Sequence, residues 1–238
     1  ERYRRFDGAP LGRGVVTFSP QTRGGAVGSV NHNRIHLLGG AGLTRDGFAE
    51  LCGWLRDDGA ETFFVGLAPG PERDHARALI VEAGFELNRW VRYPTMVLDE
   101  PAEGLPDSAL VVEQVGPQDV ASASLALGPD LWPSYLRSAG QPGFHHYMAF
   151  DGERPVAHAA LYVADGIGYL GWMSTAEADR RRGAQQALIA ARIETARALG
   201  VDTIIAETLT NLESSFGNLH RAGFRAVYDV EVYRSPDP

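Results

Sequence analysis

Apolar and polar positions in the second half of this chain form short alternating runs, separated by turns and by stretches with helical spacing. Alternation indicates a strand with one buried face, whereas apolar residues on one side of a helical wheel indicate a helix. The elements predicted in this way are strands at 109–114, 147–150, 155–163, 167–174, 203–208 and 226–234, and helices at 117–127, 131–139, 184–199 and 213–222. Antiparallel strands followed by a strand–helix–strand order predict an α/β fold with a mixed sheet, of the α+β kind.

The first half of the chain contains a shorter set of elements that matches the end of the second half. In both places a helix is followed by a strand, a second helix that ends in Ala-Gly-Phe, and another strand. The matching stretches are 59–65 with 200–206, 83–85 with 222–224, and 87–93 with 226–233. Because several successive elements agree, we interpret this order as an internal duplication. The alternative is ordinary helix capping by Gly before an apolar residue.

The polar, Pro-containing stretch 99–107 is the best candidate for a linker. We therefore expect an unassigned arm at 1–29, a partial and degenerate domain at 30–100, and a complete domain at 109–238. For the arm, a hairpin and a disordered or exchanged segment are equally compatible with the sequence.

Composition indicates a globular enzyme and argues against several other classes. The chain has 238 residues, of which 44% are hydrophobic and 22% charged, and this balance is typical of a folded protein. The net charge of −8 argues against nucleic acid or an anionic membrane as a partner. The apolar runs are too short for a membrane span or a secretory signal, so we expect a cytoplasmic protein.

The residues that bind metals or act as nucleophiles in other enzymes show no matching pattern. The single cysteine, Cys52, excludes an intramolecular disulfide and a cysteine cluster. His32 and His36 are four residues apart but lack a third ligand nearby, and neither His-Glu-x-x-His nor Gly-x-Ser-x-Gly occurs. We therefore expect no metal and no serine hydrolase.

The strongest chemical signal is the basic turn before the predicted helix at 184–199. Three arginines and Gly183 follow the strand at 167–174, and a helix start after such a turn offers free N–H groups to a phosphate. The spacing is neither that of a dinucleotide fingerprint nor that of a nucleotide P-loop. Cations are unfavourable at a helix N-terminus, so this run predicts a bound anion. The alternative is a solvated helix start.

The spacing Arg-x-x-Gly-x-Gln at 180–185 resembles the pyrophosphate loop of the GNAT acetyltransferase superfamily, Arg/Gln-x-x-Gly-x-Gly/Ala. Gln185 stands where Gly or Ala is usual. The resemblance covers residues 109–234, and residues 30–98 match only the later half of such a domain. It implies a tandem GNAT-like fold, in which the complete C-terminal domain binds acyl-CoA and the N-terminal copy is partial.

The resemblance also implies which residues hold the coenzyme. The main chain of the strand before the loop would bind the pantetheine arm, the loop would bind the pyrophosphate, and the later helix would contact the coenzyme amides. The corresponding residues are Met173, Ser174 and Thr175; Arg180, Arg181, Arg182, Gly183, Ala184, Gln185 and Gln186; and Asn211, Ser215 and Asn218. Gln185 either points sideways or bonds the phosphate itself. Ser214 and Ser215 are alternatively a simple helix cap.

Glu207 is the preferred candidate for the general base. It is an acid within the apolar run 204–209, and a carboxylate in a sheet is costly unless it is paired or hydrated. The alternative is an edge position or an arginine partner for Glu207. His158, in the strand at 155–163, is the second candidate.

The usual general acid is missing from its usual place. Many members of the superfamily have a Tyr four residues before Gly-Phe, and here that position is Leu219. Tyr228 is the preferred substitute, with Tyr233, Ser214 and Ser215 as alternatives.

Two functions follow from these residues. The first is an N-acetyltransferase that uses acetyl-CoA as cosubstrate and a small-molecule or peptide amine as acceptor, by direct attack in a ternary complex. The second is a module that binds acyl-CoA without turnover, as a sensor or regulatory partner. Either a monomer or a homodimer is compatible with the sequence.

Overall fold

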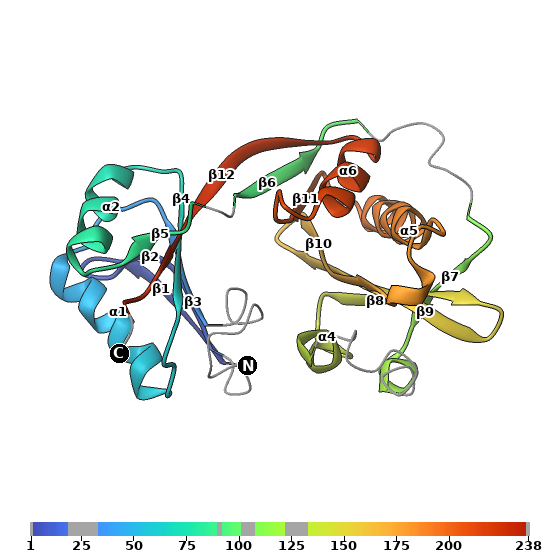
Figure 1. The fold of residues 1–238 in the computed structure, drawn as a ribbon, viewed down its shortest axis with the longest axis horizontal. Helices are drawn as coiled ribbons and strands as arrows, with labels where there is room; N and C mark the ends of the chain where they lie inside the picture. Colours follow the sequence, from blue (N-terminus) through green and yellow to red (C-terminus); the bar gives the residue numbers. More distant parts are fainter. Residues whose placement is uncertain (1, 19–32, 90–91, 101–107, 122–132, 237–238) are drawn as a thin grey trace. The chain divides into compact units, whose positions relative to one another are not determined.

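The computed structural model describes residues 2–18, 33–89, 92–100, 108–121 and 133–236 of the chain. The chain forms two compact units, Glu1–Pro94 with Tyr228–Pro238, and Thr95–Val227. It passes from the first unit to the second within β6 (Tyr93–Leu98) and back within β12 (Phe224–Arg234), as the colours of Figure 1 allow the reader to follow.

These units differ from the expected domain boundaries at both ends of the second domain. Residues from Thr95 onward belong to the second unit, because β6 pairs with a strand of its sheet. Residues from Tyr228 onward belong to the first unit, because the end of β12 pairs with a strand there. Most of the expected linker, residues 101–107, lies outside the described residues.

The first unit contains a sheet in the order β1-β2-β3-β4-β12, with the short β5 also paired to β12. Its elements are β1 (Arg2–Gly8), β2 (Gly12–Phe18), β3 (Arg34–Leu38), α1 (Arg45–Asp57), β4 (Phe64–Ala68), α2 (Arg73–Glu82) and β5 (Glu86–Leu87). β3 and β4 are parallel, and the other neighbours are antiparallel. The order α1, β4, α2 and then a strand is the one that the sequence predicts for the first half. The single strand expected at 87–93 is wrong, because β5 ends at Leu87 and β6 begins at Tyr93.

The unassigned arm begins with an antiparallel hairpin. β1 and β2 pair from Arg2↔Phe18 to Gly8↔Gly12, and β2 then pairs with β3. Of the alternatives open from the sequence, a hairpin is therefore the structure of residues 2–18. The remainder of the arm, residues 19–29, lies outside the described residues.

Helix α1 is capped and packed by residues of its own segment. The Thr44 hydroxyl accepts a hydrogen bond from the Gly47 N–H at 3.0 Å and so caps the helix. Phe48, Leu51 and Leu55 follow at helical spacing and are buried in the core of the first unit.

The second unit contains a sheet in the order β6-β11-β10-β9-β8-β7. Its elements are β7 (Val111–Val115), α4 (Pro133–Ser138), β8 (Phe144–Asp151), β9 (Arg154–Ala164), β10 (Ile167–Thr175), the 3-10 turn η4 (Glu177–Asp179), α5 (Ala184–Ala198), β11 (Thr203–Glu207) and α6 (Glu213–Arg221). β10 and β11 are parallel, and the other pairs are antiparallel. The prediction of a mixed α/β sheet is confirmed.

The predicted elements of the second unit correspond closely to the observed ones. The helix expected at 131–139 is α4, and the helix expected at 117–127 is helical over 117–121, after which the chain lies outside the described residues. The strands begin or end within a few residues of the predicted limits.

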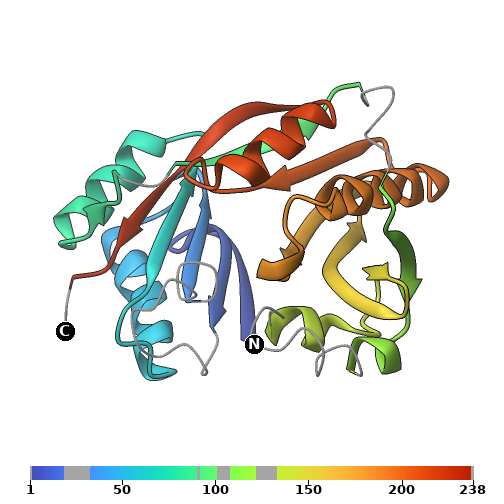
Figure 2. The ribbon, with the colours of Figure 1, turned by 45° about the vertical axis from the view of Figure 1, so that its right-hand side comes forward.

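The two faces of this sheet have different partners. α5 and α6 cover one face, where a large apolar core includes Leu161, Leu170, Leu188 and Ile204 (Figures 1 and 2). The other face carries α4, whose Tyr135 packs in a smaller core with Met148 and Ala160. Because strand side chains alternate between the faces, neighbours of these core residues point to the α4 side.

Candidate functional site

The strand β10 separates from β11 halfway along its length. Ile167 to Leu170 pair in parallel with Thr203 to Ala206, but β10 continues to Thr175 without further pairing to β11 in the part of the chain that the structure describes. A parallel ladder that stops early leaves main-chain donors and acceptors on that side for another partner.

The separation begins at a β-bulge. The register between β10 and β9 shifts between Gly171 and Ser174, and Trp172 within the shift has a φ of 49°. A bulge inserts an unpaired residue and bends the strand. Met173, Ser174 and Thr175, the predicted pantetheine positions, therefore lie in the bulge or just beyond it, on the separated part of β10.

The start of α5 provides uncapped donors next to this strand. Gly183, the N-cap residue, has a φ of 84°, and no side chain caps the helix. The predicted phosphate positions Ala184, Gln185 and Gln186 are the first three residues of the helix, so their N–H groups have no acceptor within it. A side chain at 183 would be strained and would approach the Ser108 Oγ at 3.3 Å, so the turn requires glycine.

The three arginines of the turn do not have the same surroundings. Arg180 is exposed and lies 3.9 Å from an exposed Glu177 carboxylate, and Arg181 is exposed with a φ of 66°. Arg182 instead forms ion pairs of 2.9 Å with both Asp151 and Asp179. The side chains of Arg180 and Arg181 are therefore the ones available to an anion.

Asp179 is the anchor of this turn. Its side chain is 5% exposed and also accepts two hydrogen bonds from Arg154, at 2.8 and 2.9 Å. The hydrogen bonds from Arg154, together with one from Arg182, lower the pKa of Asp179 to about 2. The carboxylate thus stays ionised and ties the loop to β9.

Gln185, the departure from the family pattern, points sideways toward α6. Its Nε2 donates to the Ser215 Oγ at 3.1 Å, and its Oε1 accepts from the Asn218 amide. Gln186 donates to the Asn218 Oδ1 at 2.8 Å and to its carbonyl at 3.0 Å. These bonds join α5 to α6 and hold the larger side chain beside the turn.

The same bonds occupy two residues that were expected to contact the coenzyme. Ser215 and Asn218 bind the α5 glutamines, and Asn218 also accepts from Arg221. The Oε1 of Gln186 is buried without a hydrogen-bond partner among the described residues. Asn211 lies in the turn before α6 and is exposed.

Glu207, the candidate base, lies at the point where the strands separate. It follows Ala206, the last β11 residue paired to β10, and pairs in register with Thr95 of β6. The Thr95 hydroxyl donates to its Oε1 at 2.9 Å. Ile204 and Ala206 face α5, so alternation places the half-buried Glu207 carboxylate on the α4 side of the sheet.

The second candidate base is packed under α4. His158 is fully buried, and its ring lies 4.3 Å from that of Tyr135. The neighbouring His146 shares hydrogen bonds of 2.9 Å with the Ser138 Oγ and 3.2 Å with the Tyr135 carbonyl. Burial lowers the pKa of His146. These histidines belong to a packed cluster, whereas Glu207 lies beside the separation of β10 and β11.

The candidates for the general acid are distributed differently. Leu219 is buried in the core that α6 shares with α5. Tyr228 lies on β12 with 38% of its surface exposed, at the residue where the chain re-enters the first unit. Tyr233 is buried and donates to Glu231 at 2.7 Å, so it is engaged in the first unit.

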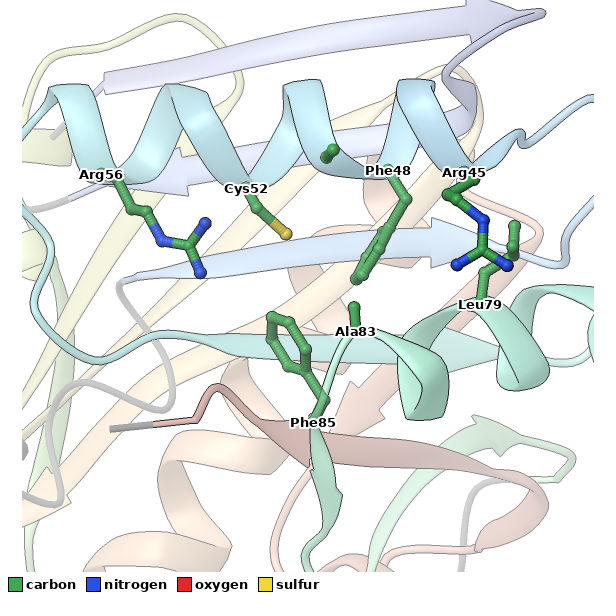
Figure 3. A pocket seen from close by; sticks show the side chains of 8 residues that line it. Arg45, Phe48, Cys52, Arg56, Leu79, Ala83 and Phe85 are labelled. Atoms are coloured by element: carbon green, nitrogen blue, oxygen red, sulfur yellow. The ribbon is translucent and has the colours of Figure 1, made fainter. Parts of the chain in front are cut away.

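A hollow of about 150 Å³ lies in the first unit, between α1 and α2 (Figure 3). Phe48, Cys52 and Phe85 line it, and the Arg45 and Arg56 guanidiniums lie at its rim. Burial raises the pKa of the Cys52 thiol to about 12, so the folded protein keeps this thiol protonated at neutral pH. None of the residues that line it is among the predicted site residues.

Three residues of the site were not expected from the sequence. Asp179 and Thr95 bind Arg154 and Glu207, which are distant from them in the sequence, and no local pattern indicates these two pairings. Arg192 is buried on the core side of α5 and donates to the carbonyl of Gly171 in the bulge. A cation at an otherwise apolar helix position was a signal that could have identified Arg192.

Comparison with known proteins agrees with this geometry. Residues 118–224 match the family model described as acetyltransferase (GNAT) family. This part of the chain therefore matches a GNAT acetyltransferase domain, and the resemblance inferred from the loop is confirmed for these residues. No curated protein matches the sequence.

Solved structures share the fold over almost the whole chain. A GCN5-related N-acetyltransferase from Kribbella flavida is 17% identical with a TM-score of 0.64, over 99% of this chain and 90% of that one. A functionally unknown conserved protein from Staphylococcus epidermidis is 11% identical with a TM-score of 0.64, over 99% and 94%. A GCN5-related N-acetyltransferase from Sphaerobacter thermophilus is 15% identical with a TM-score of 0.56, over 98% and 84%. At these identities the likeness concerns the fold.

The described residues were also compared with the requirements of a membrane-spanning helix and of a metal site. No helix among the described residues is both long and apolar enough to cross a membrane. Within the same residues, no group of three or more His, Cys, Asp or Glu side chains is placed to hold a metal ion.

Proposed function

We propose that the second unit transfers an acetyl group from acetyl-CoA to an amine of a small molecule or peptide. The observation that supports this most strongly is the early end of the β10–β11 ladder beside the uncapped start of α5. Together they present free main-chain groups to an extended amide-containing chain and to a phosphate, the two parts that acyl-CoA contains.

The residues present fit the coenzyme in three ways. The N–H groups of Ala184 to Gln186 and the helix dipole would hold the pyrophosphate. Arg180 and Arg181 would add charge-assisted hydrogen bonds, and the main chain of β10 after the bulge would hold the pantetheine arm. Gln185 leaves the turn open because its side chain bonds Ser215. When bound, the coenzyme supplies an activated thioester.

The protein's own residues would then carry out the proton transfers. Glu207 would accept a proton from the amine as the C–N bond forms and the C–S bond breaks, and Thr95 holds its carboxylate in position. The departing thiolate takes up a proton. Tyr228, the donor that the sequence suggested, belongs to the first unit. General acid–base catalysis of this kind contributes roughly 10²–10⁴-fold.

A binding module without turnover is the second candidate, and Leu219 is the observation that favours it. The family's usual tyrosine position is filled by an apolar side chain that packs into the core. Such a chain would bind acyl-CoA at the same turn, but it would not protonate the thiolate from that position.

Calorimetric titration with acetyl-CoA tests the binding step. We expect the double variant Arg180→Glu/Arg181→Glu to bind more weakly by at least about tenfold, because two charge-assisted contacts are replaced by repulsion. Arg197→Glu, a single reversal of the same kind in the last turn of α5, is the control for charge and should bind as the wild type does. Equal affinity of the double variant and the wild type would contradict the site.

Release of free thiol from acetyl-CoA in a panel of amines separates the two functions. Turnover that Glu207→Gln lowers by about 10²-fold or more, with acetyl-CoA affinity unchanged, supports an acetyltransferase in which Glu207 is the base. Binding without turnover for every amine tested supports the sensor.

A further inference from the structure

Arg192 is a charged residue in the apolar core of the second unit. It is 1% exposed and lies on α5 among the buried Leu188, Ile189 and Ile193. Burial lowers the pKa of the guanidinium to about 9. A cation in such surroundings is costly unless it is fully hydrogen-bonded, so its contacts show what the residue does.

Among the described residues, Arg192 donates hydrogen bonds to main-chain carbonyls and to one sulfur. The Nε donates to the Leu188 carbonyl at 2.9 Å, and one terminal nitrogen donates to the carbonyls of Ala160 at 3.1 Å and Gly171 at 3.2 Å. The other terminal nitrogen lies 3.2 Å from the Met173 sulfur. No carboxylate among the described residues forms an ion pair with it.

These contacts surround the bulge of β10. Gly171 and Ala160 are partners across β10 and β9, and Gly171 is the first residue beyond the end of the β10–β11 ladder. Met173 follows Trp172, the residue with positive φ. The guanidinium therefore holds the strand on both sides of the residue at which it turns away from β11.

We propose that Arg192 is a positioning residue for the coenzyme, which keeps β10 apart from β11 where the pantetheine arm binds. The inference rests on the proposed function, because it concerns the same site. Without Arg192 the buried Ala160 carbonyl and the partly buried Gly171 carbonyl lose this donor, and buried carbonyls that lack a donor are unfavourable. Nearby N–H groups, including those of β11, would then replace it, and the bulge would change shape.

Arginine suits this position because its planar fork donates in several directions at once. Lysine keeps the charge but ends in a single nitrogen, which cannot reach the Leu188 carbonyl, the bulge carbonyls and the Met173 sulfur together. Methionine keeps much of the volume and donates no hydrogen bond. The two substitutions therefore separate the hydrogen bonds from the filling of space.

The experiment compares Arg192→Met and Arg192→Lys with Ile193→Ala, a neighbouring core change on the same helix that leaves the Arg192 contacts in place. Acetyl-CoA affinity is measured by calorimetry and stability by thermal unfolding. Arg192→Met is expected to bind at least about tenfold more weakly, the size of effect for one buried hydrogen-bond partner lost, and Arg192→Lys to fall between it and the wild type. Ile193→Ala should lower the Tm while its affinity stays within about twofold of the wild type.

The fluorescence of Trp172 reports on the bulge directly. If Arg192 only stabilised the core, its replacement would not change this emission. The difference in emission between each protein and its Trp172→Phe counterpart isolates this residue from the other tryptophans. The emission maximum of Trp172 is expected to shift in Arg192→Met and to stay unchanged in Ile193→Ala.

The outcomes distinguish failure of this inference from failure of the proposed function. A folded Arg192→Met variant with wild-type affinity and unchanged Trp172 emission overturns the inference. If Arg192→Met does not fold, wild-type affinity of Arg192→Lys overturns it instead. Absence of acetyl-CoA binding by the wild type contradicts the proposed function, while the Trp172 emission still shows whether Arg192 shapes the bulge.

Discussion

The strand–helix junctions of the two units have the same order of elements but differ in whether their main-chain groups are satisfied. In the first unit β3 pairs with β4 along its whole length, as far as Leu38↔Ala68. The helix that follows is capped by the Thr44 hydroxyl. In the second unit β10 leaves β11 after Leu170, and α5 starts behind Gly183 without a side-chain cap.

The difference shows how one arrangement of elements either closes on itself or leaves a place for a ligand. A complete ladder and a side-chain cap use the groups that a coenzyme would need. An interrupted ladder and an uncapped helix keep these groups available. The unpaired main-chain groups lower the stability of the fold, so other interactions have to compensate. In the second unit Asp179 and Arg192 supply that support by fixing the turn and the bulge.

The helices that follow the two junctions, α1 and α5, also differ at one buried position. At the spacing by which Gly59 matches Gly200, Leu51 of α1 corresponds to Arg192 of α5. Leu51 is fully buried beside a continuous ladder, and Arg192 is buried beside an interrupted one. If the two halves arose by duplication, as the sequence predicts, arginine occupies this helix position in the copy with the interrupted ladder, and leucine occupies it in the copy with the complete ladder.

The largest expected effect comes from closing the turn of the second unit. Gly183→Val should weaken acetyl-CoA binding by more than about tenfold, because a β-branched residue is strained at positive φ and the turn would move. Gly42→Val is the matched control, since Gly42 has a φ of 75° in the corresponding junction of the first unit. If both variants lost affinity equally in calorimetry, the contrast between the junctions would be wrong.

Removing the anchor of the turn should have the next largest effect. Asp179→Asn is expected to lower the Tm by several degrees and to weaken acetyl-CoA binding, because Arg154 and Arg182 lose their shared carboxylate. Asp74→Asn is the control, since Asp74 forms a highly exposed ion pair on α2. Loss of stability without loss of affinity would show that the anchor does not shape the site.

The same carboxylate predicts a dependence of stability on pH. The folded pKa of Asp179 is about 2, below the value of about 3.9 for an unfolded aspartate. A lowered folded pKa gives stability that is present above about pH 4 and is lost as the pH falls toward 2. Acid unfolding of Asp179→Asn should lack this component when it is compared with the wild type by circular dichroism.

A smaller effect is expected at the capped junction. Thr44→Ala should lower the free energy of unfolding by about 1 kcal/mol, the usual value for a helix N-cap, and leave acetyl-CoA affinity unchanged. Denaturant unfolding and calorimetry measure the two quantities. A change in affinity would mean that the first junction contributes to binding after all.

The smallest expected effect is a gain in stability within α1. Gly53 is a helical glycine whose added Cβ would meet no atom within 4 Å, so Gly53→Ala should stabilise the first unit by about 0.5–1 kcal/mol. Cys52, the single cysteine, is 3% exposed next to it, and its reaction with a thiol reagent should become slower. Faster labelling would show that the substitution loosens the helix.

The sequence predicted those features that depend on neighbouring residues. The strands and helices of the second unit follow from apolar spacing, and the loop at 180–183 follows from glycine and charge next to a helix start. The open alternative for Gln185, a side chain that points sideways, is the one that the structure has.

The features that the sequence did not predict depend on distant partners. Asp179 joins the turn to β9 because Arg154, 25 residues earlier in the chain, binds the carboxylate that also binds Arg182. The division of β12 between the units depends on its pairing with β4, 164 to 170 residues earlier in the chain. Periodicity contains no information about either pairing, so the expected domain boundary at 109–238 included residues of the first unit.

The pairing of β12 with β4 has a consequence for the order in which the chain matures. Glu231 to Arg234 complete the sheet of the first unit, yet the ribosome adds them only after all of the second unit has been made. The second unit can therefore form its sheet while the first unit still lacks the end of β12. During synthesis the half of the molecule that is made first is the half that finishes last.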